Sequence, residues 1–496
     1  MNSTRASDSQ SFFILAHLFE GLTRNGPKTG EIIPGIAEKW EINDAGATFH
    51  LRKNALWSDG KPVTAADFVF AWRLVVDPRN ASEYAFIMYP IKNARLIHDG
   101  KLSAQELGVS APDSRTLKVV FEKPCAYFLY LTAFGSYYPV REDFYRANPS
   151  VYGTDVAHLL SDGPFVLSTW EHGRSLLMDK NPKYWNVSNI KLDAIDIPYI
   201  TPDNSALFQL FQEGKTDLVE RLGKSVFSQA LKAKGSVQTF VDGSVWFLEF
   251  NFRKGRPTSN LNLRLAIRAA VSLVQKTFIS KVVDVPETIM AQTLIPDWMP
   301  GVKHHFREDY PYAVPQYTLV DAKRFVAAAQ KELGGKIPPL VLLTSNTTYS
   351  SREADYFKSL LANDLGIDLR IEQQSQKSMR ARMELGEFDI LSTGWAPDYD
   401  DPMTFVDLMA SWNENNRGHF SDVNLDWLIL EAQGTVDQAK RMKAMADAER
   451  LILDQVAVIP IYQRVVAYVV NDKKLKGVVR RSVGSDPDLI WATVSP

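Results

Sequence analysis

The chain carries the stretch FDILSTGWAPDYDDP at residues 388–402, in which a short apolar strand leads into an aromatic and acidic turn. We expect the strand to break at Gly394 and the turn to present Trp395 and Asp398. Strand ends in α/β proteins are where ligands bind. A carboxylate beside an indole suits a cation, such as the α-ammonium of a peptide, through charge-assisted hydrogen bonds and stacking. The alternative is an ordinary solvated turn, because glycine, proline and aspartate are common turn formers.

Helical and strand patterns alternate on both sides of this stretch, which predicts an α/β fold with mixed sheets. Ser9 or Ser11 is expected to cap a first helix. Thr64 and Asp67 are spaced as a capping box at the start of a second helix. No repeat and no low-complexity linker separates these elements. We therefore expect lobes that interleave along the chain rather than consecutive domains.

Composition limits the class of protein. The chain has 496 residues, of which 45% are hydrophobic, so two or three domains with sizeable cores are expected. Its net charge of −2 gives no indication of nucleic-acid or anionic-membrane binding. Cys125 is the single cysteine, which excludes an intramolecular disulfide and a cysteine-rich metal site. We expect Cys125 to be a packed small hydrophobe.

The search for catalytic motifs is negative. Glycine-rich nucleotide loops, zinc-protease motifs and the nucleophile-elbow motif are all missing from the sequence. Only His304 and His305 are adjacent histidines, and sequence neighbours on a loop seldom share a metal. A calcium loop starting at Asp398 would need glycine and glutamate where Met403 and Ala410 stand. We therefore expect a protein without enzymatic activity, cofactor or metal site.

Several motifs occur in a fixed order along the chain: Leu18-Phe19-Glu20-Gly21-Leu22, Pro34-Gly35-Ile36-Ala37-Glu38-Lys39-Trp40, Trp57-Ser58-Asp59-Gly60-Lys61-Pro62-Val63-Thr64, Asn181-Pro182-Lys183-Tyr184-Trp185 and Gly394-Trp395-Ala396-Pro397-Asp398-Tyr399. In these motifs the chain resembles the extracytoplasmic solute-binding proteins of family 5, in the oligopeptide-binding branch of peptide ABC transporters. The resemblance implies a bilobed periplasmic-binding-protein-like fold (type II, cluster C), with mixed sheets in each lobe, a ligand cleft between the lobes and an extra small domain in lobe I. The implied division is lobe I at 1–19, 144–243 and 467–496, the additional domain at 20–143, and lobe II at 244–466.

The resemblance also implies a binding site. Asp398 matches the position that pairs with the α-ammonium of the ligand. Gly394, Trp395 and Ala396 match the segment that pairs with the ligand backbone, as a strand added to a sheet would. Tyr84 matches a pocket tyrosine, and its alternative is a core aromatic.

The chain departs from the family at other cleft positions. A tryptophan expected near Gln376 and an arginine expected at Ser392 are missing, and Ala396 replaces a cysteine of a disulfide found in some members. Arg221 and Arg464 stand where other residue types are expected. Each arginine could bind a ligand carboxylate bidentately or form an ordinary ion pair.

The function implied by the resemblance is capture of short peptides and their delivery to the membrane permease of an ABC transporter. We expect a monomer that is periplasmic or at the cell surface. The first residues hold no recognisable export signal, and residues 5–11 align after the family's first strand, so we expect the natural product to start upstream. The alternatives are a binder of another solute (a cell-wall peptide, an opine-like compound or a metal chelate), a signalling receptor and, outside this class, a hydrolase.

Overall fold

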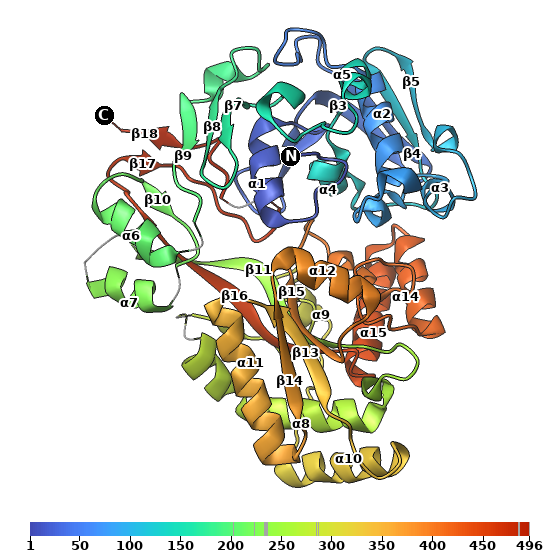
Figure 1. Ribbon diagram of the computed structural model, residues 1–496. Helices are drawn as coiled ribbons and strands as arrows, with labels where there is room; N and C mark the ends of the chain where they lie inside the picture. The colour runs from blue at the N-terminus through green and yellow to red at the C-terminus, as the bar shows by residue number, and fades with distance from the viewer. Residues whose placement is uncertain are drawn as a thin grey trace.

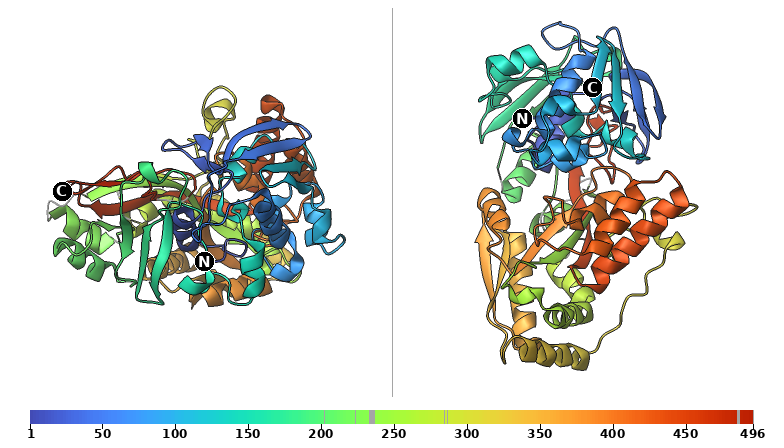
Figure 2. Two further views of the ribbon diagram at one scale, coloured as in Figure 1. Left: turned by 90° about the horizontal axis from the view of Figure 1, so that it is seen from above. Right: turned by 90° about the vertical axis from the view of Figure 1, so that its right-hand side faces the viewer.

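The computed structural model describes residues 1–201, 203–222, 224–232, 237–283, 285, 287–484 and 487–495. Figure 1 shows two lobes, one above the other, and the side view in Figure 2 separates them again. The upper lobe holds the elements from α1 (Ser9–Leu18) to β9 (Ala194–Ile197), and the lower lobe holds those from α8 (Leu261–Phe278) to α15 (Gln438–Asp454). Two long strands, β11 (Val237–Phe250) and β16 (Val458–Val470), run from one lobe towards the other.

The upper lobe contains two antiparallel sheets and a short hairpin. The four-stranded sheet has the order β3 (Ala37–Asn43), β4 (Gly46–Leu51), β6 (Thr116–Val120), β5 (Val109–Asp113), and the three-stranded sheet has the order β7 (Phe165–Glu171), β8 (Ser175–Lys180), β9. The hairpin is β1 (Thr23–Asn25) with β2 (Ile32–Pro34). The helices are α1, α2 (Ala65–Val76), α3 (Ala94–His98), α4 (Phe128–Leu131) and α5 (Glu142–Ala147).

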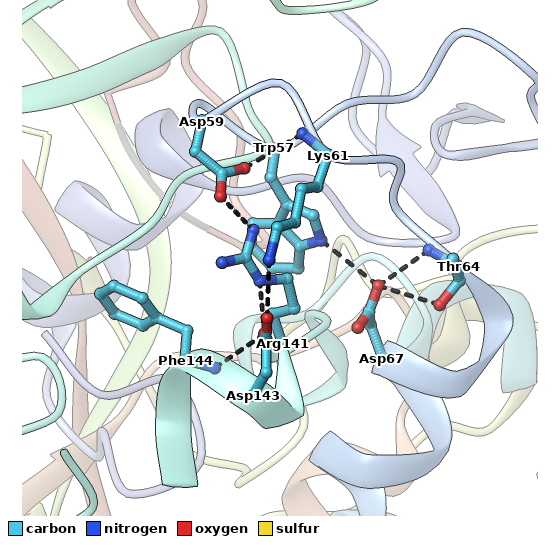
Figure 3. Close-up of polar contacts among 8 residues, drawn as sticks. All are labelled: Trp57, Asp59, Lys61, Thr64, Asp67, Arg141, Asp143 and Phe144. Carbon is cyan, nitrogen blue, oxygen red and sulfur yellow. Dashed lines mark hydrogen bonds and ion pairs between the residues drawn. The ribbon is translucent and has the colours of Figure 1, made fainter. Parts of the chain in front are cut away.

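Figure 3 shows the polar contacts that hold the loop at Trp57 to the helix that carries Asp67. The Trp57 indole donates to Asp67 at 3.3 Å, and the Thr64 backbone N–H donates to the same oxygen at 2.8 Å, so the predicted capping box is confirmed. Burial raises the pKa of Asp67, and these donors oppose the shift. Beyond the turn, Arg141 pairs with Asp59, which fixes the loop on the start of α5. These contacts therefore tie the start of α2 and the start of α5 to the same loop.

The largest sheet has seven strands. Its order is β10 (Leu218–Val219), β16, β11, β15 (Ile390–Trp395), β13 (Leu340–Ser345), β14 (Leu369–Gln374), and β12 (Ile289–Met290) pairs with β16. β13 is parallel to both β14 and β15, whereas the other pairs are antiparallel. The register between β11 and β16 shifts at a bulge between Val241 and Val245.

Helices cover this sheet and extend the lower lobe. They are α8, α9 (Phe306–Asp309), α10 (Leu319–Glu332), α11 (Thr348–Leu360), α12 (Gln376–Leu385), α13 (Met403–Val406), α14 (Val423–Gln433) and α15, while α6 (Asn204–Gln212) and α7 (Lys224–Lys232) lie beside β10. A short antiparallel pair of strands, β17 (Leu475–Lys476) and β18 (Thr493–Val494), lies near β9. One buried apolar cluster extends from α1 and α2 in the upper lobe to α15 in the lower lobe, so the lobes share a packed contact.

Two local expectations are corrected. Asp8, not Ser9 or Ser11, caps α1, and its carboxylate accepts from the Ser11 N–H at 2.9 Å. Strand β15 continues through Gly394 to Trp395 rather than breaking at the glycine, because β11 pairs with all six of its residues. Cys125 is buried, as expected, and burial raises its pKa to about 12. Within the described residues, no helix has the length and apolar character needed to cross a membrane.

Candidate ligand-binding site

Strand β15 has an unpaired edge next to the predicted site. On one side, β11 pairs with it from Ile390 to Trp395. On the other side, β13 pairs only with Ile390 and Leu391, although Thr344 and Ser345 of β13 remain paired with β14. The parallel strands therefore separate, and among the described residues the backbone from Ser392 to Trp395 has a strand partner on one side only. An extended peptide can pair with such an edge.

Gly394 is held against an aromatic ring. It lies opposite Trp246 in the ladder, and a Cβ at Gly394 would come within 2.2 Å of the indole. The Trp246 indole in turn stacks on Tyr462, with the ring centroids 6.2 Å apart. The missing side chain at Gly394 therefore leaves room for the Trp246 ring, which Tyr462 backs on its other side.

Thr404 joins the end of β15 to the turn that follows. Its buried hydroxyl accepts from the Trp395 indole N–H at 3.1 Å and from the Asp398 backbone N–H at 3.3 Å. No sequence signal points to Thr404, because a threonine six residues after an aspartate is not a recognisable motif. The hydroxyl fixes two predicted site residues relative to each other.

A buried ion pair holds the remainder of the turn. Arg441, which is 1% exposed, donates to both oxygens of Asp401 at 2.5 and 2.6 Å. The guanidinium also lies 5.0 Å from the Tyr127 ring, which stacks on Tyr399 with 5.0 Å between centroids. Because Tyr127 belongs to the upper lobe and Tyr399 to the lower one, this stack is also a contact between the lobes.

Asp398 presents a carboxylate without a full set of partners. Its Oδ2 atom is shielded from solvent, and no described residue donates a hydrogen bond to it. Burial raises the pKa of Asp398 well above its usual range, and a hydrogen bond from Tyr84 opposes the shift. A buried carboxylate with an unused oxygen favours a cationic donor, since an ion pair would compensate its desolvation.

Tyr84 reaches Asp398 from the upper lobe. Its ring stacks on Phe134 and meets Phe12 edge-on, with 5.4 Å between centroids in each pair. Burial and the charge of Asp398 raise the pKa of Tyr84, so the phenol remains a donor. The structure thus brings together Asp398, Tyr84 and the end of β15, while Ala396 lies exposed in the connecting segment.

Of the two predicted arginines, Arg464 lies beside this site, with its guanidinium 5.3 Å from the centre of the Trp246 ring, and Arg221 lies farther away. Arg464 of β16 donates to Asp242 at 2.6 Å and to Ser244 at 3.1 Å, at the bulge of β11, so a carboxylate of the chain already faces it. Arg221 is exposed in the turn between β10 and α7, and strands β16 and β11 separate β10 from β15. Gln376 is the first residue of α12, and its side chain lies outside the described part of the structure.

Comparison with known proteins defines the class. The model of the bacterial extracellular solute-binding proteins, family 5, matches residues 31–417. The oligopeptide-binding protein OppA of Bacillus subtilis is 30% identical over 97% of this chain and 88% of its own length. The chain therefore belongs to the family 5 extracellular solute-binding proteins.

Solved structures support the assignment and bear on the arrangement of the lobes. OppA of Listeria monocytogenes bound to peptide aligns with a TM-score of 0.90 at 28% identity, over 100% of this chain and 96% of that one. The murein tripeptide-binding protein MppA of Escherichia coli aligns with a TM-score of 0.88 at 28% identity, over 99% and 96%. Its unliganded open form, at the same identity, reaches only 0.70 over 99% and 94%. The lobes are thus arranged differently from that open form.

Proposed function

We propose that this protein is an extracytoplasmic, non-enzymatic substrate-binding protein that captures short peptides between its lobes and delivers them to an ABC transporter. The observation that carries the proposal is the Asp398 carboxylate, whose Oδ2 atom is shielded from solvent and receives no hydrogen bond from a described residue. It lies just beyond a strand edge for which the described residues provide no second partner. The carboxylate would receive the α-ammonium of the peptide, and the edge of β15 would pair with its backbone. Backbone pairing reads no side chain, which accounts for capture of many sequences.

The division of labour between the lobes follows from this proposal. The protein would act as a monomer in which lobe I closes over lobe II. Lobe I comprises 1–19, 144–243 and 467–496 and carries the additional domain 20–143, and lobe II comprises 244–466. The bent pair of β11 and β16 is suited to act as the hinge, because a bulge locally weakens the ladder. The closed, liganded form would then be the one presented to the membrane permease.

The test is calorimetry with a free tripeptide and its N-acetylated form, on the wild type, Asp398→Asn and Asp400→Asn. Losing a charge-assisted bond to the ammonium should weaken binding of the free tripeptide about 10- to 100-fold in Asp398→Asn. The acetylated tripeptide should bind weakly to all three proteins. Asp400→Asn is the matched control, since Asp400 faces Gly30 instead of Tyr84. Equal affinity of Asp398→Asn and wild type for the free tripeptide would refute the ammonium anchor.

A further inference from the structure

The guanidinium of Arg380 bridges the two lobes. Arg380 lies on α12 of the lower lobe, and it donates to the Ser7 hydroxyl at 2.6 Å and to the Ser7 carbonyl at 3.1 Å. It also lies 3.4 Å from the Glu83 carboxylate. Ser7 and Glu83 both belong to the upper lobe, so one side chain makes three polar contacts across the boundary.

The segment that carries Ser7 is fixed to the upper lobe. Just before it, the Asn80 amide donates to the Thr4 carbonyl at 3.1 Å and to the Thr4 hydroxyl at 3.2 Å, and Thr4 is 1% exposed. Just after it, Asp8 caps α1. Ser7 therefore moves with the upper lobe, and its bonds to Arg380 can exist only while α12 is close to that lobe.

These contacts lie next to the ligand anchor. Glu83 precedes Tyr84 in the chain, and the charges of Glu83 and Arg380 both act on the Tyr84 hydroxyl, which also faces Asp398. The Arg380 side chain is itself only partly exposed, at 33%. Separation of the lobes would therefore break the Arg380 contacts and the Tyr84–Asp398 contact together.

We propose that Arg380 is a latch that stabilises the closed form by holding Ser7 and Glu83, without touching the bound peptide. A planar guanidinium can donate to a hydroxyl and a carbonyl at once, whereas an ammonium is a single point donor. Bonds that form only on closure change the population of the closed form, and this population scales the apparent affinity of every ligand. The latch rests on the proposed function only where peptide dissociation is used to measure it.

The test compares Arg380→Ala and Arg380→Lys with the wild type in stopped-flow dissociation of several peptides that differ in length and sequence. Arg380→Ala should raise the dissociation rate about five- to tenfold, by the same factor for every peptide, and Arg380→Lys should lie between. Arg382→Ala is the matched control, because Arg382 lies on the same helix but bonds to Glu387 and Glu372 of its own lobe.

Three outcomes would overturn the latch. One is a dissociation rate of Arg380→Ala equal to that of the wild type. Another is an effect that differs between peptides, which would mean direct contact with the ligand. The third comes from an experiment that needs no ligand. Dyes are attached to Asp44→Cys and Lys336→Cys, both exposed positions, in a Cys125→Ala background. Energy transfer between the two dyes should fall when Arg380→Ala is added. Unchanged transfer refutes the latch, whereas a wild type that binds no peptide refutes only the proposed function.

Discussion

The Trp246 indole lies directly against the α-carbon of Gly394, so closely that a Cβ there would come within 2.2 Å of ring carbon Cε3. The two residues face each other in the ladder between β11 and β15, and the ring supports the strand whose other edge is free. The shape of the proposed peptide-pairing edge is therefore set by a glycine and an aromatic ring that act as a pair.

Gly394→Ala should displace β15 and damage both stability and binding. Overpacking of this kind costs about 1–3 kcal/mol of unfolding free energy, and the strand edge should move enough to weaken peptide affinity. Urea denaturation and calorimetry measure the two effects. If the indole is the cause, Gly394→Ala should cost less when it is introduced into Trp246→Leu. An equal cost in both backgrounds would contradict the explanation.

Thr404→Val should loosen the site without removing any group that contacts the peptide. The substitution keeps the approximate shape but leaves the Trp395 indole N–H and the Asp398 backbone N–H without their acceptor. An unpaired buried donor costs about 1–3 kcal/mol, so both melting temperature and peptide affinity should fall. Thr404→Ser, which keeps the hydroxyl, should retain most of both. If Thr404→Val binds as well as Thr404→Ser, the hydroxyl does not position the turn.

Peptide affinity should decrease as the pH falls. The pKa of Asp398 is raised by burial in the unliganded protein, and an arriving ammonium favours the ionised carboxylate. Binding then releases a proton at pH values between the lower pKa of the bound form and the raised pKa of the free form, so protons compete with the peptide in this range. Calorimetry in buffers of different ionisation enthalpy measures this release. Asp398→Asn should show a flatter pH dependence, and an unchanged proton release in this variant would assign the effect to another group.

Glu353 should make the protein less stable as the pH rises from about 4.5 towards 7. This carboxyl is 2% exposed, accepts from the Tyr462 hydroxyl at 3.0 Å and has no cationic partner among the described residues, and burial raises its pKa to about 7. The folded state therefore keeps a proton that the unfolded state loses above the ordinary glutamate pKa of 4.5. The resulting loss of unfolding free energy, up to about 3 kcal/mol, is complete above the folded pKa.

Glu353→Gln, which stays neutral, should remove this contribution to the pH dependence. Its unfolding free energy relative to the wild type should increase between pH 4.5 and pH 8, as measured by urea denaturation at each pH. Asp355→Asn, a change at an exposed carboxylate on the same helix α11, serves as the control and should leave the pH profile unchanged. A Glu353→Gln profile parallel to that of the wild type would show that the carboxyl is ionised in the folded state.

Local patterns were sufficient where neighbours along the chain make the structure. The capping box of Thr64 and Asp67 was predicted because both partners lie within one helical turn. The apolar residues before the acidic turn predict a strand but place its end too early, since pairing with β11 carries the strand through Gly394. The order of motifs was sufficient to identify the family, because family resemblance is carried by the sequence itself.

The sequence alone determined the class of fold, the strand and turn around Asp398, and the pairing chemistry that an acid beside an indole offers. Only the tertiary structure decided that Tyr84 meets Asp398, that Thr404 fixes the turn, that Arg464 is paired with Asp242 and that Arg380 holds Ser7. These contacts join elements far apart in the chain, and they depend on how the two lobes pack. Short-range periodicity and capping preferences carry no information about such packing, because they report only on residues within a few positions of each other.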